Sequence, residues 1–276
     1  MEIIQDTTQF HIEEKTAVAF GKFDGIHVGH RYLLEQVLES ARKYGYKSLV
    51  FTFSPSPLAF FSKEKVYELS TREEKRRLFE EMGFDYLVEF PLNKETAAIS
   101  PEDFLREYLV KRMNAACIFA GDDVSFGKNG AGNHMLLRRM SALYPYEVEI
   151  VEKRMLYGDA VSSTRVRALI DAGDVLKASE LLGKPYSVWG GPFSPMRFGM
   201  ENGRKCLPFL PDKDKLLPAS GLYKGCATLP DGTVYETKIR VGQNEHSLTV
   251  FFGEFDEKLY GKDILLSFLC KIDRIL

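Results

Sequence analysis

The stretch AVAFGKFDGIHVGHRYLLEQVLESARKYG, residues 17–45, decides how the first part of this chain is expected to fold. Its apolar start, 17–21, is typical of a buried strand, and its second half, 30–45, repeats apolar residues at helical spacing. Between them, FGKFDGIHVGH (20–30) supplies three glycines, one aspartate and two histidines. A strand, a glycine-rich turn and a helix in this order predict one unit of a helix-covered parallel sheet.

The same alternation continues along the chain. Apolar runs typical of strands occupy 48–53, 85–90, 116–121 and 146–152. Helical patterns occupy 71–83, 100–113 and 162–173, the second with Ser100 as its N-cap. Repeated alternation predicts an α/β fold, with helices on both faces of a parallel sheet and a ligand site at the carboxyl ends of its strands.

The composition changes after Leu182. The segment 183–203 holds five glycines and three prolines and has no helical period. Short apolar runs follow, and LPDGT (229–233) contains an Asp-Gly turn of the kind that hairpins favour. We therefore predict two domains, 1–182 with the parallel sheet and 183–276 as a small all-β barrel or sandwich.

Bulk composition excludes several classes of protein. The 37 lysines and arginines against 39 acidic residues give a net charge of −2, which argues against a nucleic-acid partner. No CxxC pair and no long apolar run occur, so we expect neither a zinc site nor a membrane span. With no signal-peptide core at the N-terminus, we expect a cytoplasmic protein whose cysteines are buried free thiols. The four cysteines are Cys117, Cys206, Cys226 and Cys270.

The turn at 20–30 lies where unpaired backbone N–H groups and the helix dipole favour an anion. Gly21 and Gly25 permit close backbone turns, and His27 and His30 bracket Gly29, so both imidazoles could face one ligand. The alternative is a tight turn with two surface histidines. The position directly after a buried strand favours a phosphate pocket.

A second segment, AVSSTRVRALI (160–170), has the same character. Ser162, Ser163 and Thr164 begin a helix, and Arg167 follows one turn later. Hydroxyls and a guanidinium at a helix N-terminus suit a polyanion, although a plain cap with a solvated arginine is the alternative. Two such segments suggest the two halves of a triphosphate site. Because neither carries a nucleophile with its base, direct in-line displacement at phosphorus is the expected chemistry.

These two motifs resemble the HxGH nucleotidyltransferases, and the segments between them resemble the bacterial FAD synthetase family, the bifunctional riboflavin kinase/FMN adenylyltransferases. The similarity runs in order from residue 15 to residue 182. It implies a Rossmann-like nucleotidyltransferase domain followed by a riboflavin kinase-like barrel. The segments that carry it, besides the two motifs, are FTFSPSPLAFF (51–61), STREEKRRLFEEMGFDYLVEFPL (70–92) and FAGDDVSFGKNGAGN (119–133).

The resemblance implies transfer of the adenylyl group of ATP to FMN, giving FAD and pyrophosphate, with Mg²⁺ bound to ATP and no protein-held metal. Ser54, Ser56 and Val124 stand where the family commonly has an acid, a histidine and a phenylalanine, so the flavin slot is where this chain departs from the pattern. The implied residues are His27, His30 and Arg167 for catalysis; Gly21, Phe23, Gly29, Asp123, Ser163 and Thr164 for ATP; and Pro55, Pro57, Phe61, Asp123 and Phe126 for the flavin.

The second domain resembles the riboflavin kinase barrel at 215–225 and 251–269, but the parts that carry kinase chemistry look absent. KCLPFLPDKDK (205–215) lacks the threonine and asparagine of the family motif, and Thr249 stands at the position of the catalytic glutamate, counted back from Glu254. The sequence ends at KIDRIL, where the family continues into a helix. We therefore predict a barrel without riboflavin kinase activity.

Three alternatives stay open. The chain could keep both activities, or it could transfer a nucleotide to another acceptor, as in cytidylyl or pantetheine-phosphate transfer. It could also be a flavin- or nucleotide-responsive binding protein with an inactive transferase site. The intact His27, Gly29, His30 and Arg167 favour an enzyme, and the loops at 51–61 and 119–133 favour flavin as the acceptor.

Overall fold

A computed structural model of the chain describes residues 1–192, 199–201, 204–243, 246–253 and 262–272. The chain forms two compact units. Met1–Val66 and Arg72–Ala160 make the first, called here the sheet unit. Tyr67–Thr71 and Val161–Leu276 make the second, called the barrel unit.

The sheet unit is built on a six-stranded parallel sheet with the strand order β1-β4-β3-β2-β5-β6. The chain steps from β2 through β3 to β4 on one side, then returns to the other side of β2 for β5 and β6. This reversal makes a switch point between β2 and β5, where parallel sheets bind ligands at the carboxyl ends of their strands. The strands are β1 (Glu2–Gln5), β2 (Thr16–Phe20), β3 (Lys47–Ser54), β4 (Tyr86–Pro91), β5 (Ala115–Gly121) and β6 (Glu147–Val151).

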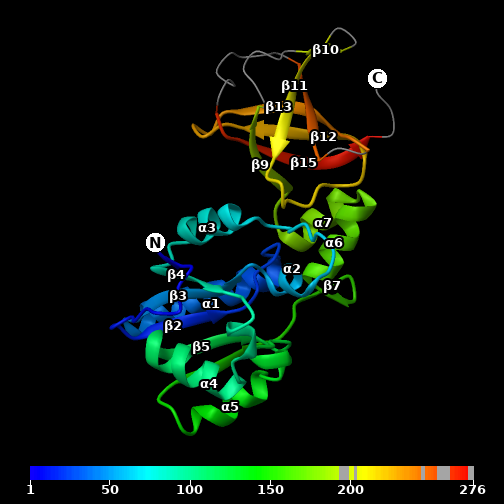
Figure 1. Ribbon diagram of the computed structural model, residues 1–276. Coiled ribbons are helices and arrows are strands. Elements are labelled where there is room, and N and C mark those ends of the chain that lie inside the picture. The colour runs from blue at the N-terminus through cyan, green and yellow to red at the C-terminus, as the bar shows by residue number, and fades with distance from the viewer. Residues whose placement is uncertain (193–198, 202–203, 244–245, 254–261, 273–276) are drawn as a thin grey trace. The chain divides into compact units, whose positions relative to one another are not determined.

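Helices cover both faces of this sheet, with α3 on one side and α4 and α5 on the other (Figure 1). Alternate residues of β2 enter two cores: Ala17 and Ala19 pack in the same cluster as α1 and α3, whereas Val18 and Phe20 pack with the helices opposite. The helices are α1 (Val28–Tyr44), α2 (Pro57–Phe61), α3 (Arg72–Glu81), η1 (Thr96–Ala98), α4 (Pro101–Phe104), the π-helix η2 (Leu105–Arg112), η3 (Lys128–Gly130) and α5 (His134–Ser141). A short hairpin, β7 (Met155–Leu156) and β8 (Asp159–Ala160), ends the unit.

The barrel unit is a closed antiparallel barrel, because β9 pairs with β15 on one side and with β11 on the other. At the hairpin between β12 and β13, Gly232 has φ +86°, as the predicted Asp-Gly turn requires. The elements are α6 (Ser163–Ala172), α7 (Val175–Leu182), β9 (Tyr186–Pro192), β10 (Gly199–Glu201), β11 (Arg204–Pro211), β12 (Gly221–Thr228), β13 (Val234–Val241), β14 (Leu248–Phe252) and β15 (Ile264–Ile272).

The expected fold class, a Rossmann-like parallel sheet followed by a small β-barrel, is confirmed. The compact units divide at Ala160/Val161 rather than at residue 182, because α7 packs against β9 and β15 of the barrel. The division into functional domains 1–182 and 183–276 stays a prediction. The predicted helix 100–113 continues from α4 as the π-helix η2, and β1 and α5 were not predicted.

Two compositional expectations can be compared with the structure. The cysteines form no disulfide within the described residues, and Cys226 and Cys270 are only half-buried. Within the described part of the chain, no helix has the length and apolar character needed to cross a membrane.

Candidate functional site

His27 and His30 lie together at the start of α1. His27 is the N-cap, and its Nδ1 accepts the backbone N–H of His30 at 3.3 Å. Because Nδ1 accepts, the neutral ring carries its proton on Nε2, which can donate to a ligand. The two imidazoles stack with ring centroids 3.8 Å apart and planes 12° apart. The spacing of the motif therefore produces one paired imidazole group rather than two separate surface histidines.

Both imidazoles are neutral near pH 7. Burial lowers the pKa of His27 to about 4, although the nearby Asp123 and Asp24 carboxylates act in the opposite direction. Burial, with a smaller contribution from His27, also holds the pKa of His30 well below its ordinary value. His30 Nδ1 is shielded from solvent, and among the residues that the structure describes it has no hydrogen-bond partner. The pair can thus serve as uncharged hydrogen-bonding groups, and the buried nitrogen of His30 would gain from a ligand.

The glycines of the turn serve different purposes. Gly25 has φ +82°, a left-handed conformation that favours glycine. Gly21 leaves room for a neighbouring ring: a Cβ there would lie 3.0 Å from Cζ of Phe23, closer than ordinary van der Waals contact. Phe23 is 1% exposed, and its ring meets that of His30 edge to face with centroids 5.3 Å apart. Phe23, predicted to contact ATP, is thus a buried ring that supports His30 in this structure.

Asp123 follows β5 and lies close enough to His27 to influence its titration. Lys153, just after β6, forms an ion pair with it: Nζ is 2.9 Å from Asp123 Oδ2. The structure thus brings His27 and Asp123 to the carboxyl ends of neighbouring strands, at the switch point. Sequence reasoning missed Lys153, although a lysine just beyond the end of a predicted strand is a usable signal.

The predicted flavin residues fall into two environments. Pro55, which follows a cis peptide bond, and Pro57 lead into α2, where Phe61 is 67% exposed. Phe126 is instead 2% exposed, and its ring packs edge to face against Phe20 with centroids 5.3 Å apart. Ser56, at the family's histidine position, is the N-cap of α2. The flavin role of these residues stays a prediction.

The second motif lies in the barrel unit. Ser162 is the N-cap of α6, accepting the backbone N–H of Arg165 at 3.3 Å. Ser163 and Thr164 occupy the first helical positions, as predicted. Arg167, one turn later, donates from Nη1 to the main-chain oxygen of Tyr67. The sequence prediction of a capped helix with an arginine one turn in is confirmed.

Of the barrel positions used to predict the absence of kinase activity, the structure describes Thr249 but not Glu254. Thr249, in β14, accepts a 3.4 Å hydrogen bond from Arg240 Nη2 through its hydroxyl. The positions of Glu254 and of the end of KIDRIL lie outside the described residues. Across the described ranges, no group of three or more histidine, cysteine, aspartate or glutamate side chains is arranged to hold a metal ion.

Known proteins resemble this chain over most of its length. A bifunctional riboflavin kinase/FMN adenylyltransferase of Listeria monocytogenes is 28% identical over 266 residues, covering 93% of this chain and 84% of the relative. The protein of that description from Escherichia coli K12 is 29% identical over 259 residues, covering 91% and 82%. A Listeria monocytogenes protein described as FAD synthetase is 30% identical over 227 residues, covering 81% and 87%.

A solved structure shares the fold. The crystal structure titled macrolide-efflux protein from Streptococcus pneumoniae superposes with a TM-score of 0.85 and 24% identity, covering 100% of this chain and 91% of that chain. At this identity the likeness concerns the fold alone. The family model for FAD synthetase matches residues 9–165, which include the histidine pair, Asp123 and the start of α6. The chain belongs to the FAD synthetase family.

Proposed function

We propose that this protein transfers the adenylyl group of ATP to FMN, giving FAD and pyrophosphate. The observation that carries the proposal is the pair of neutral, stacked imidazoles at the N-terminus of α1, beside the switch point of the sheet. Neutral donors and helix N–H groups in a shielded site suit the phosphates of a nucleotide. Membership of the FAD synthetase family favours FMN as the acceptor.

The reaction joins an oxygen of the FMN phosphate to the α-phosphorus of ATP and breaks the bond from that phosphorus to pyrophosphate. The FMN phosphate is already anionic, so the acceptor needs no general base. His27 Nε2–H and His30 would donate to phosphate oxygens on which charge develops, and because both are held by α1 they need no reorganisation. We propose direct in-line displacement without a covalent intermediate.

The other predicted residues take supporting roles. Ser163, Thr164 and Arg167, at the start of α6, would bind the β- and γ-phosphates. Asp123 would contact the nucleotide ribose and the flavin, with Lys153 holding its carboxylate in place. The flavin slot would be formed by Pro55, Pro57, Phe61 and Phe126, of which Phe126 is buried in the core and would support the slot from beneath its surface.

Mg²⁺ bound with ATP would neutralise phosphate charge, the chemistry that such an ion supplies to phosphoryl transfer. The side chains present fit an ion held chiefly by the phosphates, since Mg²⁺ commonly takes only one or two protein carboxylates. Asp122 lies directly after β5, and its Oδ1 is buried without a hydrogen-bond partner in the described part of the chain, which makes it the carboxylate oxygen best suited to such an ion.

We further propose that riboflavin kinase activity is absent, because Thr249 at the expected base position cannot accept a proton near neutral pH. The relatives named bifunctional make the opposite outcome a real alternative. Riboflavin and ATP incubated with the purified protein should yield no FMN. Production of FMN would overturn this part of the proposal and favour a bifunctional enzyme.

The main test incubates the purified protein with FMN, ATP and Mg²⁺ and measures FAD and pyrophosphate. His30→Ala should lower kcat by about a hundred- to a thousand-fold, the usual cost of removing one aimed donor. His11→Ala, an exposed histidine outside the site, is the matched control and should keep full activity. Tight binding of FMN and ATP without FAD formation would instead support a binding protein, and full turnover by His30→Ala would contradict the assignment of the pair.

A further inference from the structure

A five-residue segment, Tyr67–Thr71, lies between α2 and α3 in the sequence but belongs to the barrel unit. We call it the strap. Its Glu68 donates its N–H to the main-chain oxygen of Asp214 at 2.6 Å, and its carbonyl accepts the N–H of Leu216 at 2.8 Å. Glu68 and Lys215 thereby form a parallel β-bridge. The backbone of the strap is thus tied to the segment that leads into β12.

A buried lysine fixes the next residue of the strap. Lys215 is 2% exposed, and its Nζ donates to the main-chain oxygen of Leu69 at 2.6 Å. The same Nζ lies 4.6 Å from the ring centroid of Tyr186, which also begins β9. A buried ammonium group is costly unless it is paired, so these contacts restrain both the lysine and the strap.

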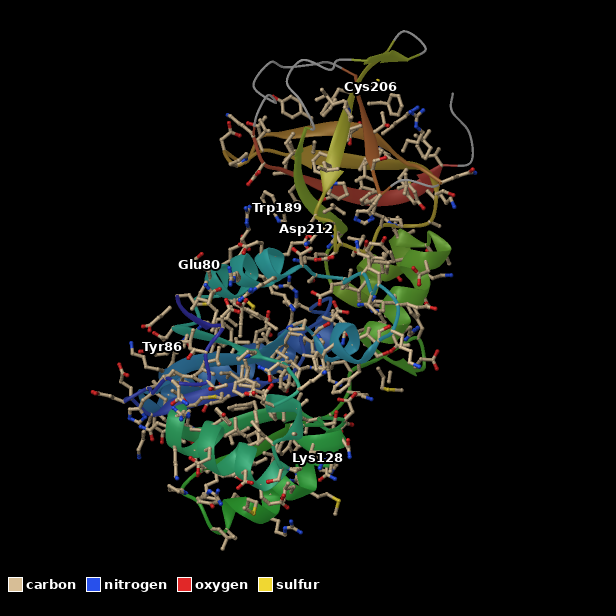
Figure 2. All side chains as sticks on the ribbon, in the orientation of Figure 1. Glu80, Tyr86, Lys128, Trp189, Cys206 and Asp212 are labelled. Atoms are coloured by element: carbon tan, nitrogen blue, oxygen red, sulfur yellow. The ribbon has the colours of Figure 1, made fainter. Side chains whose placement is uncertain are left out.

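The first residue of the strap contacts the barrel through its side chain. The Tyr67 ring stacks on His246, in the loop between β13 and β14, with centroids 4.9 Å apart and planes 13° apart. His246 Nε2 lies 2.9 Å from the main-chain oxygen of Asp212. Asp212 directly follows β11 (Figure 2). Tyr67 is therefore held both by its ring and by the backbone of its neighbour, Glu68.

Arg167 donates from Nη1 to the carbonyl of this restrained residue, Tyr67. A guanidinium carries five N–H donors in a fixed plane, so one bond to a fixed carbonyl orients the others. Ordering a long side chain before a ligand arrives removes part of the entropic cost of binding. The strap thus provides a fixed carbonyl that orients the Arg167 guanidinium before a phosphate binds.

We propose that the strap is a positioning element for Arg167, and that His246 and Lys215 of the barrel act on ATP binding through it. This inference rests on the proposed function, because it takes Arg167 as a ligand of the ATP phosphates. It gives the barrel a part in adenylyl transfer that does not depend on kinase chemistry of its own.

The test measures the Kd for ATP by calorimetry and the KM for ATP and FMN in FAD synthesis. Tyr67→Ala should raise the Kd and KM for ATP roughly three- to ten-fold, the range expected for the ordering cost of one long side chain. The KM for FMN should stay unchanged, and Tyr67→Phe, which keeps the stacking ring, should retain the ATP affinity. His246→Ala should shift ATP binding in the same direction.

Tyr235→Ala is the matched control, because it removes another barrel tyrosine, whose ring packs on Phe252 with centroids 6.4 Å apart. It should leave ATP binding as in the wild type. Circular dichroism and thermal unfolding identify any variant that fails to fold. Lys215→Met, which removes the buried ammonium, gives a second route to loosening the strap if Tyr67→Ala is unstable.

A double-mutant cycle separates positioning from general support of the fold. In the Arg167→Ala background, Tyr67→Ala should cause no further loss of ATP affinity, because the residue it acts through is gone. Independent, additive losses would overturn the inference, as would unchanged ATP binding in well-folded Tyr67→Ala and His246→Ala proteins. If the wild type binds ATP but forms no FAD, the proposed function fails while the ATP-binding cycle still tests the strap.

Discussion

The burial of His27 makes the stability of the sheet unit sensitive to mild acid. His27 is 7% exposed, and its Nδ1 can accept the His30 N–H only while that nitrogen is unprotonated. We predict that His27→Asn removes the part of this sensitivity that comes from His27 and leaves the part that comes from the buried His30. Asparagine is a good N-cap whose oxygen can accept the same N–H, and it does not titrate in this range.

The sign and size of the effect follow from the His27 pKa, which is about 4 in the folded chain and 6.5 for an ordinary histidine. A lowered pKa means that the unfolded chain takes up the proton first, so the stabilisation is complete above the unfolded value of about 6.5 and falls as the pH drops toward about 4. At about pH 5 the loss is about 2 kcal/mol, rising to about 3 kcal/mol in stronger acid. Charging both stacked rings would add repulsion between them.

The assay is urea denaturation near neutral pH and at about pH 5, followed by far-UV circular dichroism and by the exchange of backbone amides in α1. The wild type should lose about 2 kcal/mol more than His27→Asn over this range. The single tryptophan, Trp189, lies in β9 and reports on the barrel unit separately, where the substitution should change nothing. Equal pH dependence in both proteins would refute the reasoning, as would a His27 pKa near 6.5 in a histidine NMR titration.

Two further predictions concern buried groups of the sheet unit. Glu89 is 2% exposed and accepts charge-assisted hydrogen bonds from Arg72 Nε at 2.6 Å and Arg76 Nη2 at 2.6 Å. Glu89→Gln should therefore lower the free energy of unfolding by about 3 kcal/mol. An undiminished free energy of unfolding in urea denaturation would show that these two ion pairs contribute little to stability. Burial raises the pKa of the Cys117 thiol to about 11. In a peptide-resolved alkylation experiment near pH 8, Cys117 should therefore react far more slowly than the half-buried Cys270. Fast labelling of Cys117 would contradict its burial.

Local signals in the sequence determined the helix ends and the first motif. Gly45 and Gly173 end α1 and α6 with φ +69° and +78°, and Ser100 and Ser162 cap the helices that follow them. These positions are readable because a cap or a left-handed residue acts on its immediate neighbours. The spacing of His27 and His30, together with their position between a predicted strand and a predicted helix, led to the prediction that both imidazoles could face one ligand.

Tertiary structure alone decided the features that depend on residues distant in sequence. β1 is only four residues long and is stabilised by pairing with β4, and its short sequence, EIIQ, gives no indication of that partner. Phe126 lies in the core because Phe20 and Phe104 surround it, and Lys153 meets Asp123 because β5 and β6 are neighbours.

The strap is the clearest case of this division. The sequence predicts no strand at 67–70, whereas hydrogen bonds connect this segment to residues 214–216, far along the chain. The histidine pair follows from helix geometry, which a short motif specifies by itself. The contact of Arg167 with Tyr67 depends on the pairing of this segment with residues 214–216, and such long-range pairing leaves no local pattern in the sequence.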